Sequence, residues 1–416
     1  MILPFVLMLL GIALMPFVHK PWWERHYPKV SVGLGVVTVV YYLLFLGNGG
    51  RMLDVAHDYV SFMALVGSLF VVSGSIHLRV GAAAKPGTNV LFLLTGAVLA
   101  NVLGTTGASM LLIRPWIRMN QRRIAPFHIV FFIFIVSNVG GCLTPIGDPP
   151  LFLGYLKGVP FWWALEHCWQ AWGVGVLGLL LIFWVLDRRH HRRAGRSDAE
   201  AGPGGWQVDG LRNLVFLAVI LAAVFLQHPS GLREVLMAAA AAGAYWTTPR
   251  SVHEANRFDL APVREVAWLF AGLFATMAPA LDFLETHATE LGLDTEMKLF
   301  WLTGAVSALL DNAPTYLSML AAAMGRHQLS LNSGDDVRRL LVENDHELIA
   351  ISLGAVFFGA VTYIGNGPNF MVKAISEQAR VETPSFFVYL FRYAVPILLP
   401  FFALVSVLFF SRWRVF

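Results

Sequence analysis

Charged side chains are scarce in this chain: only 13% of its 416 residues are Asp, Glu, Lys or Arg, whereas 57% are hydrophobic. A soluble globular domain usually carries about 25% charged residues, so this composition excludes that class. Alternating segments of about ten residues, which mark a transmembrane barrel, are also missing. Instead, apolar stretches of roughly 20 residues recur from end to end. The sequence therefore predicts an all-α polytopic membrane protein in contact with the lipid bilayer.

Three further absences narrow the function. The only cysteines are Cys142 and Cys168, too few for a disulfide framework or a cysteine zinc site. No phosphate-binding loop and no catalytic constellation occur, so we expect no enzyme, no nucleotide and no other cofactor, which leaves ion gradients as the energy source. The net charge is only +4, and the arginines lie between apolar segments. There they act as topology determinants, and no nucleic-acid partner is expected.

The apolar segments form two sets of six, separated by a hydrophilic stretch. Residues 187–210 contain five arginines, the last of them Arg196, followed by Gly202-Pro203-Gly204-Gly205, a composition typical of a solvated linker. The first segment has no basic n-region and no clear cleavage site, so we interpret it as a retained span. The segments are residues 2–18, 30–47, 60–78, 90–113, 127–155 and 168–186, then 211–227, 232–248, 264–284, 299–324, 348–376 and 386–411.

Two segments are expected to break in the middle. The first, residues 127–155, contains Thr144-Pro145-Ile146-Gly147-Asp148-Pro149-Pro150. The second, residues 348–376, contains Thr362-Tyr363-Ile364-Gly365-Asn366-Gly367-Pro368-Asn369-Phe370. Proline removes a backbone donor and glycine loosens the chain, and broken backbone at membrane depth persists only when it is buried in protein or lines a polar cavity. Paired breaks of this kind indicate the substrate site of a secondary transporter.

The two halves of the chain are related in sequence. The second broken motif follows the first at an offset of 218 residues, and Thr95-Gly96-Ala97-Val98 recurs as Thr303-Gly304-Ala305-Val306 at an offset of 208. Leu65, Leu69 and Phe70 recur as Leu269, Leu273 and Phe274. These collinear matches predict a first repeat over 1–186, a cytoplasmic linker over 187–210 and a second repeat over 211–416.

The fourth segment of each half is expected to be a hairpin. Residues 90–113 hold Asn101 and Gly104 near their middle, and residues 299–324 hold Asp311-Asn312-Ala313-Pro314-Thr315. Cytoplasmic loops collect Lys and Arg. With two hairpins and the N-terminus outside, the loop arginines become cytoplasmic, the acidic loop 285–298 lies outside, and only the terminal Arg412 and Arg414 disagree. The prediction is two inverted repeats, about ten full spans and two re-entrant hairpins, with two broken helices meeting at the midplane.

Two of these motifs resemble those of a known transporter superfamily. The run from Ser137 to Pro150 is similar to the broken-helix signature of the ion transporter superfamily, which includes divalent anion/sodium symporters, citrate transporters, arsenite permeases and NhaD-type sodium/proton antiporters. Asp311 to Thr315 resembles the polar hairpin tip of that group. The Asp after Ile-Gly resembles the NhaD-type antiporters, whereas Pro149-Pro150 resembles the anion carriers. The resemblance implies a homodimer formed through scaffold spans and a transport domain that moves as an elevator.

Two carboxylates are the main candidates for ion ligands. Asp148 could cap the half-helix after the break, or could bind a cation or proton, since one buried Asp can exchange a proton for sodium. Asp311 could be ordinary turn chemistry or could need a pairing cation at membrane depth. We expect both to be sodium ligands. The remaining candidates can offer oxygens to sodium or hydrogen bonds to an oxyanion, and they are Thr105, Thr106, Asn138, Thr144, Gly147, Asn312, Thr315, Thr362, Gly365, Asn366 and Asn369.

Two functions stay open from the sequence. Two acidic side chains favour a cation, so the leading hypothesis is a sodium/proton antiporter with sodium and protons as the exchanged ions. Pro149-Pro150 and Gly367-Pro368-Asn369 favour the alternative, a sodium- or proton-coupled symporter of a dicarboxylate, citrate or an inorganic oxyanion. Either protein would lie in a bacterial-type inner membrane with a small ion as its substrate. His77, His128 and His167 lie near segment ends and are interpreted as interfacial.

Overall fold

The computed structural model describes residues 2–79, 81, 84–194, 207–226 and 228–411. Within them the chain is almost entirely helical, and six helices are long and apolar enough to cross a membrane. The prediction of an all-α polytopic membrane protein is confirmed, apart from one small two-stranded sheet. The predicted positions Arg196, Gly202 to Gly205, Arg412 and Arg414 lie outside the described residues.

The first half contains seven α-helices, one strand and one 3-10 turn. They are α1 (Leu3–Val18), α2 (Lys20–Leu44), α3 (Gly49–Gly74), β1 (His77–Arg79), α4 (Pro86–Asn120), α5 (Pro126–Ile135), η1 (Val139–Gly141), α6 (Pro149–Leu156) and α7 (Trp163–Ala194).

The second half begins with the strand that pairs antiparallel with β1. Its elements are β2 (Gln207–Asp209), α8 (Asn213–Val224), α9 (Leu232–Thr247), α10 (Arg250–Ala255), α11 (Ala261–Thr286), η3 (Ala288–Leu291), α12 (Glu296–Leu309), α13 (Asn312–Arg326), α14 (Gly334–Glu343), α15 (Asp345–Phe358), α16 (Gly367–Gln378), α17 (Phe386–Val388), η4 (Tyr389–Ala394) and α18 (Val395–Phe410).

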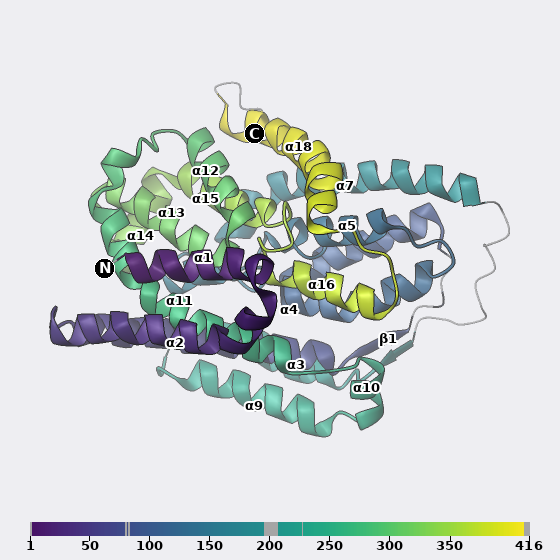
Figure 1. Cartoon of the computed structure of the whole chain (residues 1–416), viewed down its shortest axis with the longest axis horizontal. Helices are drawn as coiled ribbons and strands as arrows, with labels where there is room; N and C mark the ends of the chain where they lie inside the picture. Colours follow the sequence, from purple (N-terminus) through teal and green to yellow (C-terminus); the bar gives the residue numbers. More distant parts are fainter. Residues whose placement is uncertain (1, 80, 82–83, 195–206, 227, 412–416) are drawn as a thin grey trace.

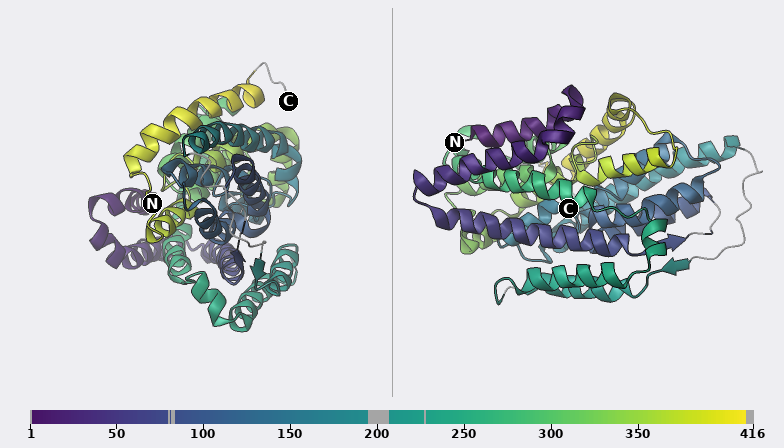
Figure 2. Two further views of the ribbon diagram at one scale, coloured as in Figure 1. Left: turned by 90° about the vertical axis from the view of Figure 1, so that its right-hand side faces the viewer. Right: turned by 60° about the horizontal axis from the view of Figure 1, so that its bottom comes forward.

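Most helices run lengthwise through one bundle, which is seen end-on in the left view of Figure 2. β1 and α10 lie at one end of this bundle, and α14 lies at the other (Figure 1). We call these the β1 end and the α14 end. The N-terminal helix α1 starts near the α14 end.

Several helix boundaries differ from those that hydropathy predicted. α2 begins at Lys20 and α3 at Gly49, about ten residues before the apolar segments 30–47 and 60–78. α7 continues to Ala194, so residues 187–194 of the predicted linker are helical. Helical hydrogen bonds continue into polar sequence until a turn residue ends them, whereas hydropathy reports only the part of a helix that is apolar.

Helix α4 folds back on itself at Gly104. Residues 89 and 120 would lie about 46 Å apart in a straight helix. Instead, the Asn89 amide donates to Asn120 Oδ1 at 2.9 Å. The only non-helical residue between them is Gly104, with φ 74° and ψ 155°. The backbone of α4 therefore folds back on itself within the segment 90–113, and the open end of this fold-back lies at the β1 end, where α4 contacts β1.

The second predicted hairpin is formed by α12 and α13. The chain leaves α12 through extended backbone at Leu310, and α13 starts after Asp311. The Arg326 guanidinium, at the last residue of α13, donates to the carbonyl of Leu293, which precedes α12. The two arms therefore lie side by side. This hairpin opens toward α14, which α13 contacts, so the two hairpins enter the bundle from opposite ends.

Both predicted helix breaks are present. The first separates α5 from α6 and contains only the 3-10 turn η1 between residues 136 and 148. The second separates α15 from α16 over residues 359–366, which have no regular helix. Each break ends at a proline-containing first turn, Pro149-Pro150 in α6 and Pro368 in α16. Proline suits that position because its missing N–H has no intrahelical partner there.

The Gly104 backbone gives a direct test of the first hairpin. We expect Gly104→Ala to lower the free energy of unfolding by about 1–3 kcal/mol, because only glycine readily adopts its φ and ψ. An added Cβ would also lie 3.2 Å from the Ile146 carbonyl oxygen. Gly173→Ala is the matched control, since a Cβ there has no neighbour within 4 Å. Chemical unfolding in mixed micelles measures both, and equal stabilities would contradict the fold-back at Gly104.

Candidate functional site

Asp148 occupies the centre of the molecule. It is the residue before α6, at the end of the first break, and it has no exposed surface. Its Oδ1 accepts hydrogen bonds from the Thr105 hydroxyl at 2.8 Å and the Asn366 amide at 2.9 Å. Its Oδ2 accepts from the Asn312 amide at 2.6 Å. Four separate segments of the chain therefore meet at one carboxylate.

This geometry decides between two interpretations of Asp148. A helix cap would accept a backbone N–H of the first turn, and the Asp148 side chain makes no such bond. Its partners are the side chains of the two hairpin tips and the second break. The interpretation as a simple cap is therefore wrong, and the carboxylate instead joins the elements that the sequence singled out.

The three donors occupy related positions in the two halves. Asn312 follows Thr105 by 207 residues, and each is the first residue of the second arm of its hairpin. Asn366 follows Asp148 by 218 residues, and each precedes a half-helix after a break. Asp148 thus contacts its own counterpart, Asn366, and also both members of the other matched pair. The sequence matches between the halves have a structural counterpart at this point.

Four helix N-termini point at this centre. The second arm of α4 starts at Thr105, and α6, α13 and α16 start at or directly after Asp148, Asn312 and Asn366. The N-terminus of a helix carries a partial positive charge and unpaired backbone N–H groups. Such a cluster favours an anionic group, and in this structure that group is the Asp148 carboxylate.

Thr144 and Thr362 stabilise the two breaks in the same way. The Thr144 hydroxyl donates to the Asn101 carbonyl at 2.6 Å and accepts the N–H of Gly147 at 3.1 Å. The Thr362 hydroxyl donates to the Ala308 carbonyl at 2.7 Å and accepts the N–H of Gly365 at 3.0 Å. Both threonines therefore satisfy loop backbone and fasten it to the neighbouring hairpin.

Gly147 and Gly365 let the two breaks double back closely. A Cβ on Gly147 would lie 2.1 Å from the Gly141 carbonyl oxygen, and one on Gly365 would lie 2.8 Å from that of Gly359. The Gly147 carbonyl in turn accepts the N–H of Thr105 at 2.7 Å. These glycines act through backbone geometry and bring the break to the hairpin tip.

Asn138 and Asn369 join the two breaks directly. The Asn138 amide donates to Asn369 Oδ1 at 2.7 Å and to the Ile133 carbonyl at 2.8 Å. The Asn369 amide donates to the carbonyls of Gly359 and Thr362. Both side chains are fully buried. Their amide groups therefore satisfy backbone carbonyls in and beside the two breaks.

Asp311 and Thr315 lie beside the centre without joining Asp148. The Asp311 carboxylate accepts the N–H of Ala313 at 3.0 Å, and the Thr315 hydroxyl donates to the Asp311 carbonyl at 2.9 Å. This is the turn and cap geometry that was one interpretation of Asp311. Asp311 is nevertheless the residue before Asn312, whose amide donates to Asp148, so the two acidic residues lie at the same hairpin tip.

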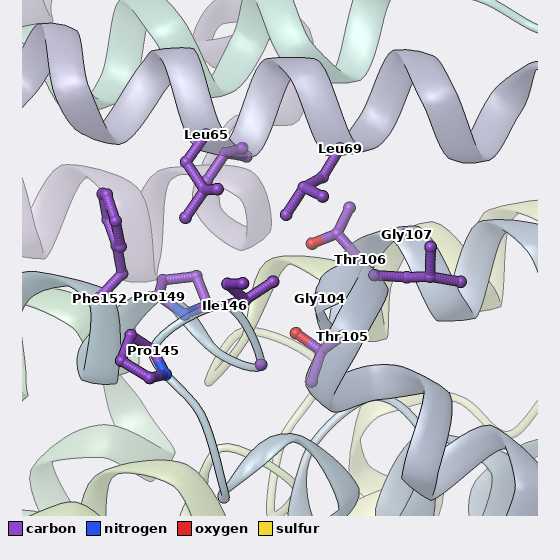
Figure 3. Close-up of a pocket in the computed structure, with 13 residues that line it drawn as sticks. Leu65, Leu69, Gly104, Thr105, Thr106, Gly107, Pro145, Ile146, Pro149 and Phe152 are labelled. Carbon is purple, nitrogen blue, oxygen red and sulfur yellow. The ribbon is translucent and has the colours of Figure 1, made fainter. Parts of the chain in front are cut away.

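A small cavity adjoins the first hairpin tip. It lies between α3, the tip and the first break, and Thr106 lines it together with Leu65, Leu69, Ile146 and Pro149 (Figure 3). In Figure 3 the two leucines point from α3 toward the break. The cavity has a volume of about 20 Å³, room for about one water molecule. A larger substrate can reach this place only if the tip and α3 separate.

Asn101 is an important residue that the sequence-based site did not include. Its amide donates to the Gly140 carbonyl at 2.7 Å, and its Oδ1 accepts the N–H of Leu143 at 2.8 Å. It therefore supports the first break from the first hairpin. Its importance could have been predicted from the sequence, because an amide in the middle of an apolar segment needs a polar partner.

These features define a class: a helical membrane transporter whose central polar site is built from two hairpins and two interrupted helices. The chain belongs to the family described as "Putative citrate transport", which matches residues 1–410. Membership implies a transporter and not an enzyme. No curated protein matches the chain. The match supports the resemblance to the wider group of ion and citrate transporters, and it does not support the NhaD-type antiporters in particular.

Proposed function

We propose that this protein is a secondary transporter of a citrate-like carboxylate anion, coupled to a proton or a sodium ion. The observation that carries the proposal is the convergence of four helix N-termini and three neutral donors at one buried carboxylate. Half-helix N-termini bind anionic substrate groups in other secondary transporters. Membership of the citrate family supports the same class of substrate.

Asp148 supplies the coupling in this proposal. Its carboxylate occupies the donors of Thr105, Asn312 and Asn366, which are the groups a substrate carboxylate would need. A second carboxylate cannot approach while Asp148 is charged, because like charges repel strongly away from water. A proton or cation on Asp148 removes that charge and weakens its hold on the donors. The substrate anion and the coupling ion therefore bind together.

A cation at Asp148 would find further oxygen ligands. The Asn312 Oδ1 atom is buried and has no hydrogen-bond partner among the described residues, although the same amide group donates to Asp148. Sodium prefers hard oxygen ligands, and an unpaired carbonyl beside a carboxylate provides them. Asp311 adds negative charge nearby. The described residues hold no group of three His, Cys, Asp or Glu side chains that could bind a metal, so this site would rest on amide, hydroxyl and backbone oxygens.

The architecture of the proposed transporter follows the sequence prediction. We propose two inverted repeats, about ten full spans and two re-entrant hairpins, because the hairpins open at opposite ends and meet at Asp148. The arginine-rich β1 end would face the cytoplasm and α1 would start outside. Residues 90–155 and 299–376 would move as an elevator against the other helices, which would form the interface of a homodimer in a bacterial-type inner membrane.

The direct test is uptake of labelled citrate and dicarboxylates by the purified protein in liposomes. We expect uptake that requires an inward proton or sodium gradient and disappears when both gradients are collapsed. Liposomes of the same lipid composition without protein give the background uptake. Absence of carboxylate uptake under every gradient would contradict the proposal.

Sodium/proton antiport remains the second candidate, because a second acidic residue, Asp311, directly precedes the Asn312 that binds Asp148. The same liposomes distinguish it: a trapped pH dye should then report proton movement on addition of sodium or lithium with no anion present. Proton movement that needs the anion supports the symporter instead.

A further inference from the structure

Three arginines line a second cavity, which lies at the β1 end of the bundle. None of the residues that bind Asp148 belongs to its lining. Arg114 and Arg118 extend from the second arm of α4, and Arg257 from the loop after α10. The C-terminal end of α16 closes the cavity with Gln378. Its volume is about 160 Å³, compared with about 20 Å³ for the cavity at the hairpin tip. It can therefore hold a small molecule without rearrangement.

The arginines of this cavity lack acidic partners among the described residues. Arg114 Nη1 is buried and has no hydrogen-bond partner. Arg118 lies 3.4 Å from Nε2 of His77, an imidazole whose Nδ1 contacts Asn256 Oδ1 at 2.7 Å. Because the Asn256 amide donates to two backbone carbonyls, its oxygen must accept from Nδ1–H. Arg118 therefore faces an imidazole and no carboxylate in the part of the chain that the structure describes.

The third arginine of the cavity, Arg257, lies in a tight turn after α10. Arg257 has φ 45°, a left-handed conformation that is uncommon for residues other than glycine, and its N–H donates to the Glu254 carbonyl at the end of α10. Arg114, Arg118 and Arg257 all line the same cavity. Like charges around one cavity repel one another, and an anion between them would offset this repulsion, most of all at Arg114, the least exposed of the three.

We infer that this cavity is a second anion-binding site, separate from the site at Asp148, for a carboxylate or phosphate group with several oxygens. Guanidinium groups bind such oxygens in pairs and in a defined geometry, and arginine suits carboxylate and phosphate recognition for this reason. The bound anion would link α4 and α16 to the loop after α10. The anion would therefore connect two elements of the central site, the hairpin α4 and the half-helix α16, to a loop outside that site.

Two sources can provide this chemistry: a free anion from solution and the phosphate headgroup of an anionic phospholipid. In detergent without added lipid, we expect inorganic phosphate or citrate to raise the melting temperature at constant ionic strength. Binding to Arg257→Ala should be weaker by roughly tenfold or more, as expected for the loss of a charged hydrogen-bond donor. Arg122→Ala is the matched control, because Arg122 is an exposed arginine of the neighbouring loop outside the cavity.

A second arm tests the lipid source in nanodiscs of zwitterionic lipid with and without an anionic phospholipid. Native mass spectrometry should then show anionic lipid retained by the unaltered chain and by Arg122→Ala, and lost from Arg257→Ala. Either the free-anion or the lipid result supports the site and identifies its source. Anion and lipid binding that are unchanged in both Arg257→Ala and Arg114→Gln would overturn the inference. Neither measurement depends on transport, so the proposed function is tested separately.

Discussion

Asp148→Asn is expected to abolish accumulation of the anion while leaving anion exchange active. In liposomes, gradient-driven uptake should fall to the level of simple equilibration. Exchange of labelled for unlabelled citrate should stay within about tenfold of the unaltered protein, because one altered hydrogen bond costs only about 1 kcal/mol. Asparagine has the shape of the neutral acid but can bind neither a proton nor a charge-paired cation. The substitution thus removes the coupling ion and keeps the donors.

The surroundings of Asp148 can accept this amide. The new N–H group would face the amide of Asn312, but Asn312 Oδ1 has no partner and can turn to accept it. Thr105 and Asn366 can still donate to the remaining oxygen. Asn138→Ala serves as a comparison at a buried amide that does not contact Asp148, and it should affect stability more than coupling. Gradient-driven accumulation that persists in Asp148→Asn would contradict the proposed role. If the variant instead loses both accumulation and exchange, and the unaltered chain moves protons in response to sodium, the antiporter is favoured.

The two breaks and the two hairpin bends could be predicted because the sequence departs at these places from that of an ordinary apolar membrane helix. Glycine, proline and acid in apolar segments predicted both breaks, and the loop arginines predicted both hairpins. The partners of Asp148 could not be deduced in the same way, because side-chain donors and backbone donors satisfy a carboxylate equally well, and only the three-dimensional packing of the tips decides between them.

Sequence reasoning failed where polar residues are buried outside a motif. Asp187 was interpreted as the first residue of a solvated linker, and His128 as an interfacial residue. Both are fully buried, because α7 continues beyond the apolar segment and packs its polar end against α4 and α5. A charge at the end of an apolar segment has the same local sequence whether it faces solvent or a partner. Hydropathy cannot distinguish an exposed charge from a paired, buried one, because it depends only on residue type and carries no information on contacts.

That buried cluster around Asp187 gives the largest expected effect on stability. Asp187 accepts two hydrogen bonds from the guanidinium of Arg123, one from the Asn89 amide at 2.9 Å, and lies 3.1 Å from His128 Nε2. The His128 Nδ1 atom accepts the N–H of Ala125, so Nε2 carries the proton and donates to Asp187. The carboxylate therefore ties the open end of the first hairpin to α5 and α7.

We expect Asp187→Ala to lower the free energy of unfolding by about 3–5 kcal/mol, because it leaves the Arg123 charge buried and unpaired. Asp209→Ala is the control: its partner Arg79 has a side chain that is 58% exposed, and such surface pairs contribute about 0–1 kcal/mol. A double variant, Asp187→Leu with Arg123→Met, should recover much of the loss, since it buries no charge. Chemical unfolding in mixed micelles measures all three. Equal losses for Asp187→Ala and Asp209→Ala, or no recovery in the double variant, would show that the buried charge is not what makes Asp187 necessary.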